Sequence, residues 1–428
     1  MPGPLKGVRV ADFTEIIAGP LAGRILAEMG ADVIKIEPPW GEPWRLTQRF
    51  TAPDSSKPES RTFMTYNRGK RSLPLDLTKP EAQEILSRLA QRIDVVLVNY
   101  RPDVAEKLGV DYEKLSAINP RLVYCELTAY GRRGPDAHRP GYDMIIQAMT
   151  GMIASETKTV DDVPSWVWSS PLIDTSSGIA MAGSVSAALF ARERTGMGQK
   201  IETTLLGQAL NLMGARFLHV EKLDRETREK TLRDIREQRE AGASFDELVN
   251  LSPGSRRREH HGNIYYRVYM AADGPIGVGC LSQPLRLRLL ETLGLTDESM
   301  APGWDASKPE SQAYSRDLER RAEELFRSKP SAEWLRILEE RNIPAGPVRF
   351  IEEMFDDPQV AANGLVDEFT HVQEGQVRMV GPYARFSGTP LPHAPPSPAL
   401  GQHTGEILEW LGYTPEDVER LRQDRTVG

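Results

Sequence analysis

Residues 7–37 read GVRVADFTEIIAGPLAGRILAEMGADVIKIE, and this stretch decides the fold. Short runs rich in β-branched residues at 7–13 and 31–36 flank a helical period at 21–29. The apolar runs lack a clean period of two, which is typical of parallel strands that helices cover on both faces. A strand, a helix and a second strand in this order predict a parallel pair joined by a right-handed crossover.

The same alternation continues along the first third of the chain. A helical period at 80–91 is followed by apolar runs at 94–99 and 122–127. Repeated strand–helix units of this kind build a Rossmann-like, doubly wound parallel sheet. We therefore predict an α/β fold for this region.

The second half of the chain shows a different pattern. Residues 221–240 are mostly charged and predict an exposed connecting helix. Two strands around the turn 272–274 and helices near 284–293 and 315–327 predict a small α+β domain. A proline-rich stretch at 382–398 precedes a closing helix near 404–411. The predicted division is a large α/β domain beginning at 1–205, a helical linker at 206–261, the small α+β domain at 262–335, and a return linker with the last part of the large domain at 336–428.

Composition excludes several classes of protein. The 428 residues carry 53 Lys and Arg against 61 Asp and Glu, a net charge of −8 that disfavours nucleic acid as a partner. Two cysteines, Cys125 and Cys280, cannot form a disulfide framework. The first residues lack the apolar run of a secretion signal, and no run of about 18 uncharged apolar residues is present. We expect a cytoplasmic protein without a membrane partner.

Familiar catalytic and cofactor motifs do not occur. Glu37 ends the second strand, but the first turn lacks the G-x-G-x-x-G of dinucleotide-binding proteins. P-loop, G-x-S-x-G and H-E-x-x-H patterns are also missing. Adjacent side chains such as His260 and His261 point apart, so they do not predict a shared metal, and we expect no metal site.

Two carboxylates have ambiguous positions. Asp174 follows an apolar approach and precedes a helical period at 179–192, where an acid is usually an N-cap. Asp143 follows Pro140 and Gly141, which is typical of turn chemistry. The residue pattern leaves a catalytic role open for both.

Five blocks of the sequence, in the same order, resemble CoA-transferase family III, which includes formyl-CoA transferase, carnitine CoA-transferase and α-methylacyl-CoA racemase. The blocks are VADFTEIIAGPLAGRILAEMGADVIKIEPP from residue 10, NRGKRSLPLDL from 67, DVVLVNYRPDVAEKLGVDYEKLSAINPRLVYCELTAYGRRGP from 94, GYDMIIQAMTG from 141 and RTGMGQKIETTLL from 194. The resemblance covers almost the whole chain apart from the charged stretch after Val220.

The resemblance implies specific site residues. Asp174 matches the nucleophilic aspartate of the transferases, and Tyr142 stands where the racemases have a histidine. The substrate and acyl pocket is expected to include Glu15, Ile16, Ile17, Ala18, Gly19, Tyr142 and Asp143. The residues expected to bind CoA are Ile16, Ala18, Asn67, Lys70, Arg71, Asn99, Tyr100, Arg101 and Lys107. Lys and Arg suit phosphates and Tyr suits the adenine ring.

The sequence departs from the formyl-CoA transferase pattern at two points. Ile17 stands where that pattern often has glutamine, and residues 252–255 with the following arginine-rich run replace a glycine-rich loop. The apolar pair Ile16 and Ile17 favours a larger or less polar acyl group than oxalate.

The expected function is that of an acyl-CoA:carboxylate CoA-transferase that uses aspartyl anhydride and aspartyl-CoA thioester intermediates. The substrates are then CoA, as an acyl-CoA, and a carboxylic acid, with no tightly bound cofactor. The resemblance also implies an interlocked homodimer. Two alternatives stay open: an α-methylacyl-CoA racemase or related acyl-CoA isomerase that uses Asp143 or Asp174 as a base, and a non-catalytic CoA-binding protein.

Overall fold

The computed structural model describes residues 3–46, 60–161, 163–252 and 263–428, and the chain divides into two compact units. The first unit is formed by Met1–Ser255 and Ala362–Gly428, and the second by Arg256–Ala361. The sequence pattern placed the return to the large domain at residue 336. The second unit reaches further because the strand Ala345–Pro347 pairs within its sheet.

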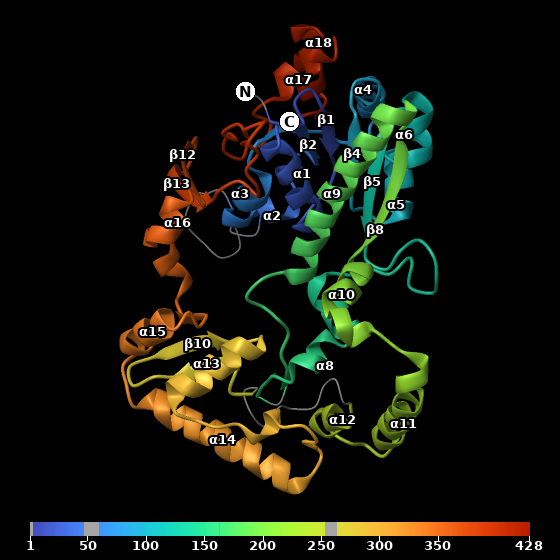
Figure 1. Cartoon of the computed structure of the whole chain (residues 1–428). Helices are drawn as coiled ribbons and strands as arrows, with labels where there is room; N and C mark the ends of the chain where they lie inside the picture. Colours follow the sequence, from blue (N-terminus) through green and yellow to red (C-terminus); the bar gives the residue numbers. More distant parts are fainter. Residues whose placement is uncertain (1–2, 47–59, 162, 253–262) are drawn as a thin grey trace. The chain divides into compact units, whose positions relative to one another are not determined.

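A six-stranded parallel sheet forms the centre of the first unit (Figure 1). Its order is β3-β2-β1-β4-β5-β8. The strands are β1 (Arg9–Asp12), β2 (Asp32–Glu37), β3 (Lys70–Pro74), β4 (Val95–Val98), β5 (Val123–Thr128) and β8 (Gln199–Thr204). The predicted α/β fold with a doubly wound parallel sheet is confirmed. The strand order reverses between β1 and β4, which is where ligands bind in such sheets.

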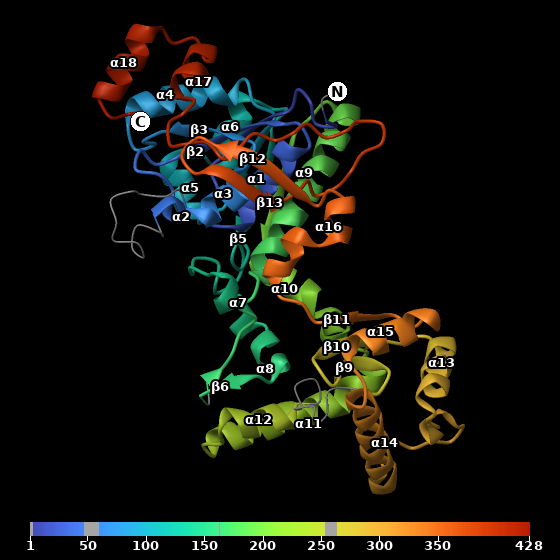
Figure 2. The ribbon, with the colours of Figure 1, turned by 90° about the vertical axis from the view of Figure 1, so that its left-hand side faces the viewer.

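Alternate residues of each strand face two different helical layers. Val10 and Val33 pack on the side of α1 (Ala18–Glu28) and α9 (Leu172–Thr195). Ala11 and Ile34 pack on the other side, with α4 (Pro80–Ala90), α6 (Tyr112–Ile118), α17 (Thr404–Trp410) and α18 (Pro415–Gln423). The two views show α17 and α18 beside the sheet domain (Figure 2). The last residues of the chain therefore complete a core that the first residues begin.

The edge strands β3 and β8 were not predicted from the sequence. Both carry polar and charged residues, KRSLP and QKIETT, instead of an apolar run.

The remaining elements of the first unit are α2 (Pro43–Leu46), α3 (Arg61–Asn67), α5 (Pro102–Leu108), α7 (Asp143–Met149), α8 (Met152–Glu156), β6 (Thr159–Val160), β7 (Val163–Pro164), α10 (Leu205–Met213), η2 (Gly214–Phe217), α11 (Glu221–Glu240), α12 (Phe245–Leu251), α16 (Pro358–Ala362, which crosses the unit boundary), β12 (Val366–His371) and β13 (Gly375–Val380). The charged helix α11 buries none of its residues, as its sequence predicts.

The second unit contains a three-stranded antiparallel sheet. Its strand order is β11-β10-β9, with β9 (Tyr266–Met270), β10 (Pro275–Gly279) and β11 (Ala345–Pro347). The helical elements are α13 (Gln283–Leu293), η3 (Glu298–Met300), α14 (Pro309–Arg327), α15 (Ser331–Glu340) and η4 (Ile351–Asp356). Tyr269 stacks on Phe326 with ring centroids 4.0 Å apart, and both lie in this unit's apolar core.

One helix among the described residues, α9, has the length and hydropathy of a membrane-spanning segment. The helix contains Asp174 and several Ser and Thr residues, so it is not the uncharged apolar run that the sequence was found to lack. Ile173, Met181 and Val185 of α9 are buried in the core shared with the sheet. Its apolar composition is therefore explained by packing inside the first unit.

A buried ion pair lies beneath the first turn of the sheet. The ammonium group of Lys70 on β3 donates to Asp12 Oδ2 at 2.7 Å, to the carbonyl of Pro20 at 2.8 Å and to Asn67 Oδ1 at 2.8 Å. Lys70 and Asp12 are both fully buried. Burial lowers the pKa of Lys70 to about 8, although the carboxylate of Asp12 opposes this shift.

This pair predicts a large stability effect. The substitution Lys70→Met leaves the Asp12 carboxylate buried without its main counter-ion, so the free energy of unfolding is expected to fall by about 3–5 kcal/mol in urea denaturation. The double variant Asp12→Leu/Lys70→Met removes both charges and is expected to lose less. Lys107 is exposed, so Lys107→Met serves as a control with a change within about 0.5 kcal/mol. A Lys70→Met variant as stable as the unmodified protein would contradict the buried pair.

Candidate active site

A cavity of about 380 Å³ lies at the carboxyl ends of strands on both sides of the point where the strand order reverses. The turn after β1 and residues 99–104 after β4 form one part of its wall, and the segment after β5 forms another. The lining residues are Glu15, Ile16, Ile17, Ala18, Pro43, Asn99, Tyr100, Arg101, Pro102, Val104, Leu127, Thr128, Ala129, Ala137, Arg139, Pro140, Gly141, Tyr142, Asp174 and Leu205. This is the position expected for the ligand site of a doubly wound sheet.

The turn between β1 and α1 is fixed by hydrogen bonds to its backbone. The carboxylate of Asp12 accepts the backbone N–H of Thr14 at 2.9 Å and its hydroxyl at 2.5 Å. The side chain of Asn99 bonds both backbone groups of Glu15, accepting from its N–H at 2.9 Å and donating to its carbonyl at 2.8 Å. A Cβ on Gly19 would lie 2.3 Å from Cβ of Thr14, so only glycine allows this close packing.

Asp174 projects from the first turn of α9. The helix begins at Leu172, so Asp174 lies inside it and is not its N-cap. One turn later, a Cβ on Gly178 would lie 2.6 Å from the carbonyl oxygen of Ala18, which shows how closely α9 crosses the start of α1. Since residues four apart share a helix face, Asp174 is directed toward the start of α1.

Asp143 performs the capping that the sequence pattern assigned to Asp174. Asp143 Oδ2 accepts the backbone N–H groups of Ile173 at 2.8 Å and of Asp174 at 3.1 Å. Gln147 donates to Asp143 Oδ1 at 2.5 Å and accepts the N–H of Val167 at 2.9 Å. The start of α9 is thus held by a carboxylate from α7, a long-range contact that turn patterns do not reveal.

The electrostatic environment changes the acidity of Asp174. Burial raises its pKa to about 7, and the negative charge of Asp143 adds to this shift. The pKa of the Tyr66 phenol on α3 is also raised. Burial is the larger cause, and the negative charge of the nearby Asp174 carboxylate is the second. A carboxylate with a raised pKa is more basic, and it is a candidate functional group where it lines a cavity.

A second carboxyl group in the cavity wall is also perturbed. Burial raises the pKa of Glu15, and the carboxylates of Glu42 and Glu37 add to this effect while Lys35 opposes it. Burial followed by the charge of Glu15 raises the pKa of Tyr100, so its phenol stays neutral. The cavity therefore has ionisable groups in its wall besides Asp174.

The structure brings together most of the residues expected for the pocket. Glu15, Ile16, Ile17, Ala18, Asn99, Tyr100, Arg101, Tyr142 and Asp174 all line the one cavity. Gly19 and Asp143 lie outside the lining, and they support it through the contacts with Thr14 and with the start of α9.

Four residues expected to bind CoA lie elsewhere. Lys70 and Asn67 are buried and bonded to each other beneath the turn, so neither presents a polar group to the cavity. Arg71 forms ion pairs with Asp32 at 2.6 Å and Glu406 at 3.0 Å, away from the lining. Lys107 is exposed near the end of α5. The sequence blocks are continuous, but strand β3 directs its alternate side chains inward and outward, which separates Lys70 from Arg71.

Several lining residues were missed by the sequence reasoning. They come mainly from the end of β5, which supplies Thr128, and from the segment 129–141 after it, which supplies Ala137 and Arg139. The glycines and arginines of GRRGPDAHRPG directly after a buried strand were the available signal, because loops at the carboxyl ends of parallel strands form ligand sites. Among the described residues no group of three or more His, Cys, Asp or Glu side chains could hold a metal ion. The His260–His261 pair and residues 253–258 lie outside the described residues.

Fold and site together define an α/β enzyme with a perturbed carboxylate in a cavity beside two helix N-termini. Residues 5–404 match the family model described as CoA-transferase family III. The chain is 32% identical to succinate–glutarate CoA-transferase of Agrobacterium fabrum, over 97% of each chain. It is 30% identical to succinyl-CoA:glutarate CoA-transferase of Mus musculus, over 98% of this chain and 89% of the relative. The crystal structure of Rv3272 from Mycobacterium tuberculosis matches with a TM-score of 0.74 and 28% identity, over 95% of this chain and 99% of that one. The chain belongs to CoA-transferase family III and is a CoA-transferase enzyme.

The raised pKa of Asp174 predicts a pH-dependent stability cost. The unfolded chain ionises this group near pKa 3.8, whereas the folded chain holds the proton until about pH 7. The folded state therefore binds more protons between these values, and its stability contribution falls as pH rises from about 4 to about 7. The variant Asp174→Asn removes this loss, so we expect it to be more stable than the unmodified protein at pH 8, with the difference shrinking toward pH 4.

Urea denaturation at several pH values measures this difference. The exposed Asp103 supplies the matched control Asp103→Asn, which is expected to show no such pH-dependent gain. The quantity to compare is the stability of Asp174→Asn minus that of the unmodified protein at each pH. If this difference is no larger at pH 8 than at pH 4, the result contradicts a buried carboxylate at this position.

Proposed function

We propose that this enzyme transfers CoA from an acyl-CoA to a carboxylic acid, with Asp174 as the covalent nucleophile. The single observation that carries the proposal is the placement of the Asp174 carboxylate in the cavity, with its pKa raised to about 7. Ionised carboxylates of ordinary acidity are weak nucleophiles, and burial makes this one more basic. Asp143 caps the start of α9, so the Asp174 carboxylate is not needed for that capping.

The first half of the reaction releases the donor acid. A carboxylate oxygen of Asp174 attacks the thioester carbonyl carbon, the C–S bond breaks, and CoA leaves as a thiolate. This leaving group resembles a thiol of pKa about 8.5. The thiolate then attacks the aspartyl carbonyl of the resulting anhydride. The donor acid leaves as a carboxylate, and Asp174 is left as a thioester of CoA.

The second half repeats these steps with the acceptor. The acceptor carboxylate attacks the aspartyl thioester, which forms a new anhydride and frees the CoA thiolate. The thiolate attacks the acyl carbonyl of that anhydride, and the Asp174 carboxylate leaves. The bonds formed and broken are balanced over the whole cycle, so no oxidant, metal or net proton transfer is needed.

The start of α1 is suited to stabilise the tetrahedral oxyanions of these steps. Within the part of the chain that the structure describes, the backbone N–H groups of Ile17, Ala18 and Gly19 donate to no acceptor. Ile17 and Ala18 line the cavity, and Asp174 is directed toward them from α9. Free N–H groups at a helix N-terminus favour negative charge, and oxyanion donors of this kind typically contribute about 3 kcal/mol each.

The rest of the wall suits an acyl-CoA. Arg101 and Arg139 supply guanidinium groups suited to phosphates, and Tyr100 supplies an aromatic ring. Ile16 and Ile17 form an apolar border that favours an acyl chain longer than that of oxalate. The two curated relatives above act, by their names, on succinate and glutarate, so we propose short to medium carboxylic acids as donor and acceptor.

The covalent step is directly testable. Incubation with an acyl-CoA is expected to place an acyl or CoA adduct on the peptide that contains Asp174, and hydroxylamine trapping with mass spectrometry detects it. The variant Asp174→Asn is expected to form no adduct and to lose at least about 10³-fold in turnover. The rate of adduct formation is expected to rise with pH around a midpoint near 7, because only the ionised carboxylate attacks.

Four outcomes contradict the proposal. An adduct on another residue, or full turnover in Asp174→Asn, excludes the nucleophile. Exchange of the α-hydrogen of a 2-methylacyl-CoA in D₂O without an acceptor acid indicates a racemase or isomerase. Binding of CoA with no turnover of any acyl-CoA indicates a binding protein.

We further propose that two copies of the chain associate, in the interlocked form with large and small domains that the resemblance implies. Within the first unit, apolar side chains are exposed on and next to α11: Phe217, Leu218, Val220, Leu223 and Leu232. A hollow of about 380 Å³ lies among them, lined in part by Phe217 and Leu232. Contiguous exposed apolar surface of this kind typically marks an interface.

Native mass spectrometry tests this association. The expected mass is twice the 47.8 kDa of one chain, and Phe217→Asp is expected to shift the population toward the single-chain mass because a charge would be buried at the interface. Glu226→Gln on the charged helix serves as the control and is expected to leave the mass unchanged. A single-chain mass at micromolar concentration contradicts the proposal.

A further inference from the structure

Ile16 has a backbone conformation that its side chain disfavours. Its φ is 74°, in the left-handed region where a β-branched residue is strained. The next residue, Ile17, has φ −126°, so of these two only Ile16 lies in the left-handed region. Such a residue persists only where its surroundings hold it. The turn that carries Ile16 also lines the cavity, so this conformation affects the site.

Glu42 provides the contact that holds Ile16. Its carboxylate oxygen Oε2 accepts the backbone N–H of Ile16 at 3.1 Å. Glu42 is fully buried, and its other oxygen, Oε1, has no hydrogen-bond partner among the described residues. A buried carboxylate oxygen without a hydrogen-bond partner costs stability, so this oxygen needs an explanation beyond the packing around it.

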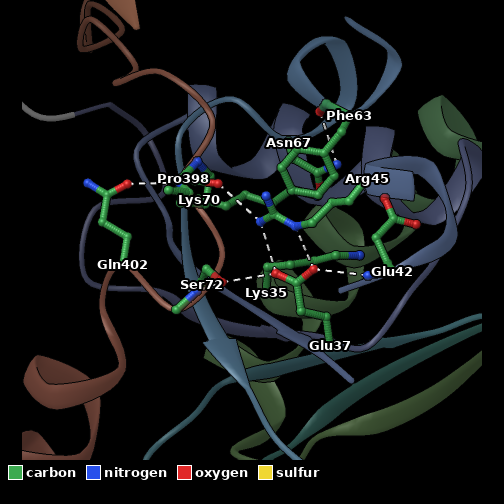
Figure 3. A network of polar contacts seen from close by, with 12 residues as sticks. Lys35, Glu37, Glu42, Arg45, Phe63, Asn67, Lys70, Ser72, Pro398 and Gln402 are labelled. Carbon is green, nitrogen blue, oxygen red and sulfur yellow. Dashed lines mark hydrogen bonds and ion pairs between the residues drawn. The ribbon is translucent and has the colours of Figure 1, made fainter. Parts of the chain in front are cut away.

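The position of Glu42 is itself fixed by a network, which Figure 3 shows in detail. Its backbone N–H donates to Glu37 Oε2 at 3.2 Å, and Arg45 binds the same carboxylate with two bonds of 2.8 and 3.0 Å. Ser72 on β3 donates to Glu37 Oε1 at 2.9 Å. Arg45 also donates to the carbonyl of Pro398 at 3.0 Å, so the C-terminal part of the chain takes part.

These contacts meet at the segment that faces Asp174. Asn99 fixes both backbone groups of Glu15, Glu42 fixes the N–H of Ile16, and the next three N–H groups are the free ones at the start of α1. If Ile16 relaxed to a negative φ, the chain direction after it would change and these N–H groups would turn away from their present positions. A displacement of about 1 Å in such a group can cost about 10²-fold in rate.

We propose that Glu42 is a positioning residue that holds Ile16 in its left-handed conformation and thereby directs the N–H groups of Ile17 and Ala18 toward the cavity. This proposal rests on the proposed function for its effect on rate, but its structural part stands on the Glu42–Ile16 contact alone. Glu42 does not line the cavity, so it acts through the backbone of Ile16 and not on the substrate itself.

The test removes the hydrogen bond between Glu42 and the N–H of Ile16, and separately relieves the backbone strain at Ile16. Glu42→Leu removes the acceptor, and Glu42→Asp keeps the charge but withdraws the oxygen by one methylene group. Both are expected to slow adduct formation on Asp174 by about 10- to 100-fold, with a smaller change in the affinity for acyl-CoA. Glu42→Gln keeps an acceptor oxygen and is expected to stay within about fivefold of the unmodified rate.

A second substitution, at Ile16, distinguishes a positioning role of Glu42 from a general loss of structure. Glycine adopts positive φ without strain, so adding Ile16→Gly to Glu42→Leu or Glu42→Asp is expected to restore at least about fivefold in rate. Ile17→Gly removes a similar side chain at a residue with negative φ and is the matched control, which is expected to give no rescue. Equal rescue by both glycines, or a folded Glu42→Asp variant with unchanged rate, overturns the proposal.

Hydrogen–deuterium exchange of residues 13–20 measures the Glu42–Ile16 hydrogen bond independently of enzyme activity. The N–H of Ile16 is expected to exchange slowly in the unmodified protein and at least tenfold faster in Glu42→Asp, because it loses its acceptor. Equal exchange in the two proteins overturns the proposal. If the unmodified protein forms no adduct on Asp174, the proposed function fails, and this exchange result still decides whether Glu42 holds the turn.

Discussion

The buried ion pair between Asp12 and Lys70 is the contact on which the rest of the site depends. Burial acts to raise the pKa of Asp12, but Lys70 and Lys35 together lower it below its usual value, so the group stays ionised. One oxygen of this carboxylate receives Lys70, while the other orders Thr14 at the start of the turn. Lys70 in turn reaches the carbonyl of Pro20 in α1. A single pair thus joins two strands, the active-site turn and the following helix.

The site above this pair is built from groups that are unfavourable for stability. Asp174 is largely buried beside a second carboxylate, Glu15 is half-buried in the wall, and Ile16 is strained. Such features persist where surrounding contacts over-determine them, and they gather at functional sites. Here the surrounding contacts come from Asn99, Glu42 and Asp143, none of which needs to touch the reacting atoms.

Local sequence patterns predicted the fold well where burial dictates residue type. The central strands appear as apolar runs because helices cover both faces, whereas the edge strands β3 and β8 are polar and escaped detection. The site was predicted only in part. Lys70 stands in a block that implied CoA binding, yet the structure buries it under the turn. Arg139 lines the cavity but stands in a loop without periodicity, so only the place of that loop after a buried strand pointed to it.

The sequence by itself determined the parallel α/β architecture, the helical character of 221–240 and the family, because these follow from local periodicity and from ordered blocks of residues. Only the tertiary structure decided which of the matching residues meet. It showed that Asp143, thirty-one positions away, caps the helix of Asp174, and that Glu42 holds Ile16. Distances between residues far apart in the chain, and the burial that shifts the pKa of Asp174 to about 7, arise from packing and are not written in any local pattern.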